Sequence, residues 1–335
     1  MKYPFPFSAI VGQNEMKQAI IVSAIDSTIG GVLVFGDRGT GKSTAVRALA
    51  ALLPPIETID GCPYNCETPN KKCPYCLRKK NHKLVRRKTP VIDLPLGATE
   101  DRVVGALDIE SALVAGKKMF EPGLLAKANR GFLYIDEVNL LEDHIVDLLL
   151  DVAASGENLV EREGLSIRHQ AKFVLVGSGN PEEGELRPQL LDRFGLSVEI
   201  SSPKDLSQRV EVVKRRDQYE NNYKNFIKKW RLEDGKLRRR ILKSRTNLQS
   251  IETPDEIIQK CAEICMALGA DGLRGELTLL RSIRALAAFQ GKKVVGVSHI
   301  TEIASSALRH RLRRDPLDES GSASRVMRVV NDVLK

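Results

Sequence analysis

A glycine-rich loop between a strand-like run and a helix-like run constrains this chain more than any other feature. The apolar run is Val32–Phe35, and the helical pattern covers residues 44–50. The loop between them fits the pattern G-x-x-x-x-G-K-[ST] and consists of Gly36, Asp37, Arg38, Gly39, Thr40, Gly41, Lys42 and Ser43. A strand, this loop and a helix in succession predict a phosphate-binding loop rather than a chance turn.

The residue types in the loop suit a nucleoside triphosphate with its magnesium ion. Glycines allow successive backbone N–H groups to close around a phosphate, because no Cβ stands in the way. Lys42 is expected to reach the β- and γ-phosphates, and the Ser43 hydroxyl is expected to bind Mg²⁺. The helix that follows adds the positive end of its dipole. We therefore predict that the chain binds a nucleoside triphosphate and Mg²⁺.

Length and composition favour a protein that is made and used in one compartment. The chain has 335 residues, 42% of them apolar, so two domains, or one large and one small domain, are expected. No uninterrupted apolar run approaches the ~20 residues that a membrane span needs. The first residues also lack the charged and apolar regions of a secretory signal. We expect no membrane span.

Positive charge is unevenly distributed along the chain, whose formal net charge is +9. Lysine and arginine are concentrated at residues 71–88, 224–245 and 309–314. Such clusters can attract nucleic acid or another polyanion. Solvated helix faces and subunit contacts explain them more often, so we do not expect nucleic acid as a partner.

Four of the six cysteines form two short pairs. Cys62 and Cys66 are a C-x3-C pair, and Cys73 and Cys76 are a C-x2-C pair six residues further on. Four thiolates can surround a zinc ion tetrahedrally, and short pairs commonly supply them. The interval between these pairs is shorter than in common zinc modules. Three interpretations stay open: a zinc or iron–sulfur site, a redox-responsive loop, and free surface thiols.

Strand-like and helix-like segments alternate over residues 1–200, which predicts an α/β fold with a largely parallel sheet covered by helices. The clearest helix pattern is Glu142–Ala154, whose apolar residues fall on one stripe. Four continuous apolar runs are expected to be strands buried on both faces: Val32–Phe35, Pro90–Leu94, Gly131–Ile135 and Phe173–Gly177.

Insertions and a change of pattern complete the predicted organisation. Residues 105–123 look like an inserted hairpin or helix, and residues 159–168 alternate around Glu163-Gly164 like a hairpin. Residues 205–250 are strongly charged and predict one or two long helices with a break at Gly235. Residues 254–315 predict further helices that begin at Pro254-Asp255 and stop at Pro316. An α/β nucleotide-binding domain is thus followed by an all-helical domain.

Polar side chains at the ends of two predicted strands supply the rest of a hydrolytic site. Asp136 and Glu137 follow the run that ends at Ile135. We expect Asp136 to hold the hydrated Mg²⁺ and Glu137 to orient and deprotonate the attacking water. Asn180 follows the next strand and can reach both the γ-phosphate and that water. Its alternative role is a turn residue before Pro181.

Two arginines are candidates for sensing or stabilising the γ-phosphate. Arg193 lies thirteen residues after Asn180, just past the predicted sheet. This position is hard to aim at the nucleotide of the same chain but suits the nucleotide of a neighbour, where such a cation raises the rate by several powers of ten. Arg274, at a predicted helix start in the second domain, can couple the angle between the domains to hydrolysis.

This order of motifs resembles the AAA+ ATPases, and longer stretches resemble one family among them, the ATPase subunit of magnesium chelatase. The second domain is more similar to the bacteriochlorophyll-type enzymes than to the chlorophyll-type enzymes. The cysteine pairs and the basic residues around them match no fixed family pattern. The similar stretches cover nearly the whole chain and are residues 7–13, 94–102, 120–126, 176–195, 271–277 and 310–318.

The resemblance implies a fold with an AAA+ domain at residues 1–202, a charged helical linker at 203–250 and a helical lid domain at 251–335. The insertions near 105–123 and 159–168 become the family's helix-2 and pre-sensor inserts. The implied catalytic residues are Glu137, Asn180, Arg193 and Arg274. Ring geometry places Arg193 of one subunit at the nucleotide of the next.

The resemblance also implies an activity and partners. ATP hydrolysis, with Mg²⁺, drives insertion of Mg²⁺ into protoporphyrin IX to give Mg-protoporphyrin IX in chlorophyll or bacteriochlorophyll synthesis. The implied partners are further copies in a hexameric ring, a second AAA+-containing chelatase subunit and a large porphyrin-binding catalytic subunit. The implied location is the bacterial cytoplasm, or the plastid stroma in a eukaryote.

Two other functions are compatible with the same motifs. A nucleic-acid motor shares the inserts and makes use of basic clusters, but no separate DNA-binding module is present in the sequence. A scaffold that binds ATP without turnover is the other alternative, and the presence of Glu137 and Arg193 argues against it.

Overall fold

A computed structural model describes the chain except residues 1–2, 38, 70–72, 79–81, 109–118, 163–164, 181–185, 271 and 313–320. The features named above that lie outside the described residues are Arg38 of the phosphate loop, the middle of the insertion at 105–123, the Glu163-Gly164 turn, Pro181 and Pro316. Within the described ranges, every helix is too short or too polar to cross a membrane.

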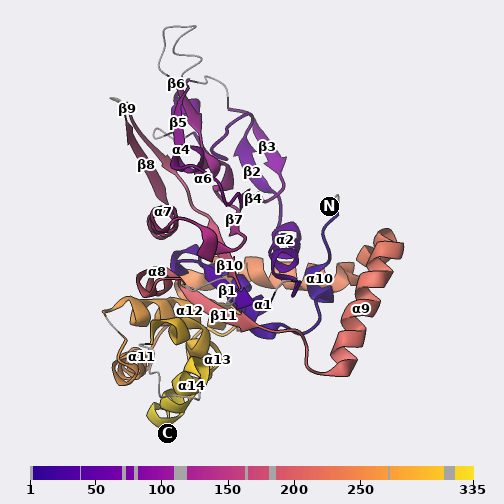
Figure 1. Ribbon diagram of the computed structural model, residues 1–335, viewed down its shortest axis with the longest axis vertical. Coiled ribbons are helices and arrows are strands. Elements are labelled where there is room, and N and C mark those ends of the chain that lie inside the picture. The colour runs from indigo at the N-terminus through magenta and orange to yellow at the C-terminus, as the bar shows by residue number, and fades with distance from the viewer. Residues whose placement is uncertain are drawn as a thin grey trace.

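A five-stranded parallel sheet forms the centre of the N-terminal part (Figure 1). Four of its strands confirm the four predicted from apolar runs, and the fifth, β11, was not predicted. The β11 segment was not predicted because its apolar residues alternate with Ser197 and Glu199. Continuous apolar runs are typical of strands inside a parallel sheet, and β11 lies at its edge. In spatial order the strands are β11 (Leu196–Ile200), β1 (Val32–Gly36), β10 (Val174–Gly179), β7 (Phe132–Ile135) and β4 (Val91–Leu94).

Alternate residues of the strands face two separate cores. Val32 and Val34 belong to a core shared with α1 (Asn14–Ile25) and α2 (Lys42–Leu52). Leu33 belongs to the other core, which includes α7 (Asp143–Ser155), within a residue of the helix predicted there. Other short helices described in this part include η1 (Phe7–Ala9), η2 (Ser27–Ile29), α4 (Glu100–Val104), α6 (Leu124–Ala128), η3 (Val138–Leu140) and α8 (Pro188–Arg193).

Three antiparallel strand pairs extend from the sheet at the upper end of Figure 1. Two of them lie where insertions were predicted: β5 (Gly105–Asp108) with β6 (Met119–Pro122), and β8 (Glu157–Arg162) with β9 (Leu165–Gln170). The third, β2 (Ile56–Ile59) with β3 (Leu84–Arg87), was not predicted. The segment between β2 and β3 contains α3 (Pro74–Arg78) and the four clustered cysteines.

The C-terminal part is built from helices, as predicted. It comprises α9 (Leu206–Asn221), α10 (Tyr223–Asn247), η5 (Leu248–Ser250), α11 (Asp255–Leu268), α12 (Arg274–Gln290), α13 (Val297–Leu308), η6 (Arg309–Arg311) and α14 (Ser322–Val333). Helix α11 begins after Pro254, where the sequence predicts a start. Side chains of α12 and α13 share the core of α1, so the lid and the sheet are joined by one continuous apolar interior. The limits of residues 1–202, 203–250 and 251–335 stay predictions.

The break predicted at Gly235 is wrong. Gly235 lies inside α10, and the chain breaks at Asn222 between α9 and α10. The Asn222 side chain accepts a hydrogen bond from the backbone N–H of Asn225, which caps the new helix. A glycine inside a long helix costs only about 1 kcal/mol relative to alanine, so α10 continues through Gly235. Asn222 is an N-cap residue, and N-cap residues mark the start of a new helix.

Candidate functional site

The phosphate loop connects β1 to α2 and opens into free space. Gly39 and Gly41 have φ of +79° and +86°, and a Cβ placed on either would meet no atom within 4 Å. Such backbone conformations favour glycine and leave N–H groups accessible to an anion. The Lys42 ammonium donates to the carbonyl of Gly36 and lies 3.4 Å from the carbonyl oxygen of Gly179 at the end of β10.

The segment before α1 supports the loop. The side chain of Gln13 donates to the carbonyl of Thr40, and the Thr40 hydroxyl donates to the carbonyl of Asp37 at 2.8 Å. Gln13 itself has a left-handed backbone, with φ of 48°. No role for Gln13 was predicted from the sequence, but the fold places its side chain against the loop.

Asp136 is fixed by two hydroxyl groups that the sequence analysis missed. Ser178 on β10 donates to Asp136 Oδ1 at 2.7 Å. The Tyr134 hydroxyl lies 3.1 Å from both Asp136 Oδ1 and Ser178 Oγ. Burial raises the pKa of Tyr134, so the phenol stays protonated as a donor. The carboxylate therefore has one oxygen held within the protein, while the residue as a whole is exposed.

Glu137 has a strained backbone beside this network. Its φ and ψ are 56° and 59°, which is the left-handed region. This conformation costs a non-glycine residue roughly 1–2 kcal/mol, and such strain concentrates at functional sites. The Glu137 N–H donates to Ser178 Oγ at 3.3 Å, so one serine supports both acidic residues. Asn180, at the end of the same strand, is buried.

These residues fit a nucleotide with Mg²⁺. The open glycine loop suits a phosphate, and an exposed carboxylate held at one oxygen suits a hydrated divalent cation. Asn139, after β7, has a buried amide that finds no hydrogen-bond partner among the described residues. Its Oδ1 lies 3.4 Å from the position of a Cβ on Gly179. A buried amide without a partner requires an explanation, and a polar group bound between the strand ends provides one.

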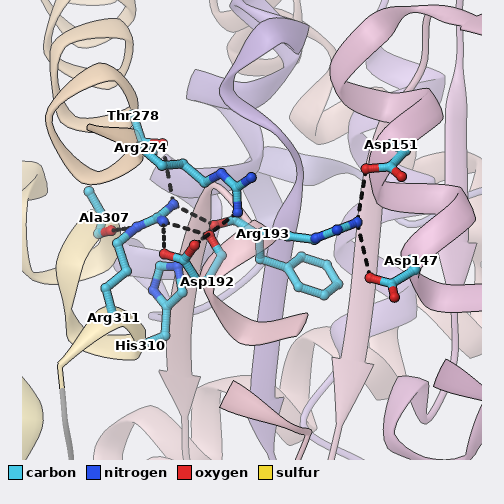
Figure 2. Close-up of polar contacts among 10 residues, drawn as sticks. Asp147, Asp151, Asp192, Arg193, Arg274, Thr278, Ala307, His310 and Arg311 are labelled. Atoms are coloured by element: carbon cyan, nitrogen blue, oxygen red, sulfur yellow. Dashed lines mark hydrogen bonds and ion pairs between the residues drawn. The ribbon is translucent and has the colours of Figure 1, made fainter. Parts of the chain in front are cut away.

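Arg193 is paired within its own chain (Figure 2). Its Nη1 lies 3.0 Å from Asp147 Oδ1 and 2.9 Å from Asp151 Oδ1, and both aspartates belong to α7. The side chain remains 33% exposed. These contacts direct the guanidinium toward α7, so Asp147 and Asp151, which bind it, are separate from the strand-end cluster of Asp136 and Glu137.

Asp192, the residue before Arg193, forms ion pairs with two arginines from the helical part (Figure 2). Arg274 Nη1 lies 2.8 Å from Asp192 Oδ2, and Arg311 Nη1 lies 2.6 Å from Asp192 Oδ1. Arg311 also donates to the carbonyls of Phe194 and Ala307. The sequence predicts that Arg274 senses the γ-phosphate, and that role stays a prediction; in this structure its guanidinium pairs with Asp192. No role was predicted for Asp192 or Arg311. Together they join the lid to α8.

His310 reinforces the same connection. Its Nε2 lies 3.0 Å from the carbonyl oxygen of Phe194, so the neutral ring donates from Nε2. Burial, with the neighbouring Arg311 and Arg309, lowers the pKa of His310 to about 3. Arg309 in turn pairs with Glu15 on α1. Arg309 and Arg311 are therefore buried contacts within the chain, and not a solvated or nucleic-acid-binding cluster as the 309–314 run suggested.

The four cysteines are brought together, which rules out free surface thiols. All four are buried, and their sulfur atoms lie within 4.8 Å of one another. Hydrogen bonds from Cys66 and Cys73 lower the pKa of the Cys62 thiol, while the contact with Cys62 raises the pKa of Cys66 and that of Cys73. Sulfurs this close cannot all ionise unless a cation lies among them.

Two groups of predicted residues thus emerge. The phosphate loop, Asp136 and Glu137 meet around the end of β10, where Gly179 and Ser178 contact them. Arg193 and Arg274 meet at α8, where Asp192 and its neighbours link the sheet to the lid. A parallel sheet, a phosphate loop after β1, an acidic pair after β7 with β10 between these two strands, and a helical lid define the class of AAA+ P-loop ATPases.

Comparison with known proteins agrees with this class. A family model described as "Magnesium chelatase, subunit ChlI" matches residues 108–187, and an AAA lid domain model matches residues 258–330. The magnesium-chelatase 38 kDa subunit of Cereibacter sphaeroides is 68% identical over 334 residues, covering 100% of both chains. That of Rhodobacter capsulatus is 64% identical, covering 98% of this chain and 94% of the relative.

Solved structures agree as well. A chain in a complex of the BchI and BchD subunits of magnesium chelatase is 60% identical, covers 99% of each chain and has a TM-score of 0.58. A putative ATPase from Cytophaga hutchinsonii is 18% identical with a TM-score of 0.65, which supports the fold alone.

The chain belongs to the family of the magnesium-chelatase 38 kDa subunit, ChlI or BchI. This confirms the resemblance, the α/β AAA+ fold with a helical C-terminal part, and the role expected from the resemblance. That role is as the ATPase subunit of the enzyme that inserts Mg²⁺ in chlorophyll or bacteriochlorophyll synthesis. Use of nucleotide and Mg²⁺ is general to this AAA+ family.

Proposed function

We propose that ATP is hydrolysed at the interface between adjacent copies of this chain in a hexameric ring. The observation that carries the proposal is the separation of the two residue groups. Lys42, Asp136 and Glu137 surround the end of β10, whereas Arg193 contacts α7 of its own chain and remains one third exposed. A cation in that position serves the nucleotide of a neighbouring copy, as in other ring ATPases that supply an arginine in trans.

The residues of one chain have distinct tasks in this mechanism. Bound ATP with Mg²⁺ supplies the phosphoryl group and a divalent charge. Lys42 and the loop N–H groups bind the phosphates, and the Ser43 hydroxyl and Asp136 hold the cation with its water. Glu137 orients a water molecule and accepts its proton, while the Asn180 amide positions that water.

Two arginines complete the mechanism from outside the strand-end cluster. Arg193 of the adjacent copy stabilises the negative charge that develops on the transferred group. Arg274 senses the γ-phosphate from the lid. Its ion pair with Asp192 connects the lid to Arg193 of the same chain, the next residue in the sequence. A change of lid angle then moves the arginine that serves the next copy, so hydrolysis is a property of the ring.

The work done by hydrolysis is transmitted to partner subunits. We propose a second AAA+-containing chelatase subunit and a large porphyrin-binding catalytic subunit as partners, with protoporphyrin IX as the final acceptor of Mg²⁺. The similarity to a chain in a complex of the BchI and BchD subunits of magnesium chelatase supports the first of these partners. The proposed location is the bacterial cytoplasm, or the plastid stroma in a eukaryote.

A reconstituted insertion assay tests this function. The purified chain is combined with the two partner subunits, protoporphyrin IX, Mg²⁺ and ATP, and Mg-protoporphyrin IX is followed by its fluorescence. We expect insertion with the wild-type chain and none with the Lys42→Ala variant. Insertion at the wild-type rate with Lys42→Ala would contradict the role of this phosphate loop.

A further inference from the structure

The segment between β2 and β3 brings four cysteine sulfurs to one point. The Sγ atom of Cys62 lies 3.8 Å from that of Cys73 and 4.0 Å from that of Cys76. All four sulfurs, including that of Cys66, lie within 4.8 Å of one another. A disulfide requires about 2.05 Å between sulfurs, so these separations do not describe disulfide bonds.

The separations match a tetrahedral thiolate site around one ion. Four sulfurs at about 2.3 Å from a central zinc ion are about 3.8 Å from one another, which is the edge of the tetrahedron. An iron–sulfur cluster divides its four cysteines between two or four iron atoms, so the four sulfurs cannot all lie this close to one another. The backbone N–H of Cys76 also lies 3.5 Å from Cys73 Sγ, a contact that stabilises a thiolate.

The surroundings are those of a closed site. The four cysteines are at most 4% exposed and share a small separate core with Ile59, Tyr64 and Ala126. Cys261 and Cys265 provide a contrast within the same chain, since they lie one turn apart on α11 in the main apolar core. Burial there raises the pKa of each thiol to about 12, as expected for cysteines that act as ordinary core residues.

We propose that Cys62, Cys66, Cys73 and Cys76 bind one structural zinc ion. Four protein ligands leave no open coordination position, which is typical of a structural zinc site and not of a catalytic one. The proposal is independent of the hydrolytic mechanism, because none of the four cysteines contacts the phosphate loop in any described hydrogen bond.

The ion holds together a segment that has little other regular structure. Between β2 and β3 the described residues contain one short helix, α3, and a segment this small rarely folds on its own core without a metal or disulfide. The segment is anchored to the rest of the chain by Asn129, which donates to the Tyr64 carbonyl at 2.7 Å, and by the Tyr64 ring against His169 on β9. Zinc therefore fixes one hairpin against the α6–β7 connection and the β8–β9 hairpin.

Metal analysis of the full chain tests the proposal. The wild-type protein is purified without chelators, and its zinc and iron contents are measured by mass spectrometry. We expect one zinc per chain and no iron. Replacement of the metal by Co²⁺ is expected to give the absorption bands of tetrahedral cobalt with four thiolates, a measurement that requires no variant.

Two variants separate ligand loss from general damage. Cys73→Ser is expected to reduce the zinc content at least tenfold, whereas Cys261→Ala, which removes a buried cysteine elsewhere, should keep one zinc per chain. Both are checked for folding by circular dichroism and for ATP binding. A folded wild-type protein without metal, in which the four thiols are free or form disulfides, would overturn the proposal. Stoichiometric iron in place of zinc would overturn the choice of metal.

Discussion

The guanidinium of Arg311 donates to both the carboxylate and the main-chain carbonyl of Asp192, at 2.6 and 2.5 Å (Figure 2). The Arg311 side chain is only 2% exposed, whereas that of Asp192 is 38% exposed, so the arginine is the buried partner of the pair. Asp192 immediately precedes Arg193, the residue proposed to serve a neighbouring nucleotide. This single connection therefore ties the position of the lid to the arginine that acts between copies.

Removal of the Asp192 carboxylate should destabilise the chain strongly. Asp192→Ala leaves the buried Arg311 without its charged partner, which costs about 3–5 kcal/mol. Asp192→Asn keeps an acceptor oxygen and should cost less. The free energy of unfolding in urea checks both. Glu57→Ala, which breaks an exposed pair with Arg86, is the control and should cost under about 1 kcal/mol. Equal stability of Asp192→Ala and wild type would show that the connection is unimportant.

Ser178 should contribute to Mg²⁺ binding although it does not contact the ion in our proposal. Ser178→Ala removes the hydrogen bond that fixes Asp136, a loss of about 1–2 kcal/mol. We therefore expect roughly tenfold more Mg²⁺ to be needed for half-maximal ATP hydrolysis. Ser197→Ala, which replaces a buried serine on the edge strand β11, separated from β10 by β1, should leave the Mg²⁺ requirement unchanged. An identical Mg²⁺ dependence for Ser178→Ala and wild type would exclude this positioning role.

Substitution of Glu137 should separate ATP binding from hydrolysis. Glu137→Gln keeps the size and backbone of the residue but cannot accept a proton, so the variant should bind ATP normally and hydrolyse it at least a hundredfold more slowly. Nucleotide binding is measured by calorimetry and turnover by phosphate release. Lys42→Ala is the opposite control and should lose tight binding. Hydrolysis by Glu137→Gln at the wild-type rate would show that Glu137 is only structural.

Acid sensitivity should depend on His310. Its pKa is about 3 in the folded chain, against about 6.5 when unfolded. Below pH 6.5 the unfolded state therefore binds the additional proton, and stability falls as the pH falls toward 3. The contribution lost between pH 6.5 and 5 is roughly 2 kcal/mol.

The variant His310→Gln tests this directly. Glutamine can still donate to the Phe194 carbonyl but does not titrate, so its urea stability should vary less with pH over the same range. His169, also buried with a lowered pKa, keeps part of the acid sensitivity in both proteins. The same pH dependence in His310→Gln and wild type would contradict the burial of a neutral imidazole at this position.

Local patterns in the sequence predicted the features that depend on neighbouring residues. The phosphate loop, the four apolar strands and α7 can each be recognised from a short stretch of consecutive residues. The structure has these strands and this helix. The edge strand β11 and the break at Asn222 were missed, because an alternating strand gives a weaker pattern and a capping asparagine gives less signal than a glycine.

Contacts between distant segments could not be predicted from local patterns. Ser178 and Asp136 are 42 residues apart, and Arg311 and Asp192 are 119 apart. The first pair depends on the order of the strands in the sheet and the second on the packing of the lid. Neither can be predicted from a short stretch of consecutive residues. The cysteines are an intermediate case: their spacing indicated a metal site, but only the fold shows that all four sulfurs meet.

Subunit mixing with an Arg193→Ala variant tests most directly whether hydrolysis takes place between copies. Wild-type chain is mixed with increasing fractions of the variant, and ATP hydrolysis is measured at fixed total concentration. The double variant Asp147→Asn with Asp151→Asn is the control, because it removes the ion pairs of Arg193 within its own chain but keeps the guanidinium. If Arg193 acts on a neighbouring nucleotide, the Arg193→Ala chain should lower activity more than in proportion to its fraction, while the control should not. A strictly proportional loss of activity with Arg193→Ala would contradict hydrolysis at a shared interface.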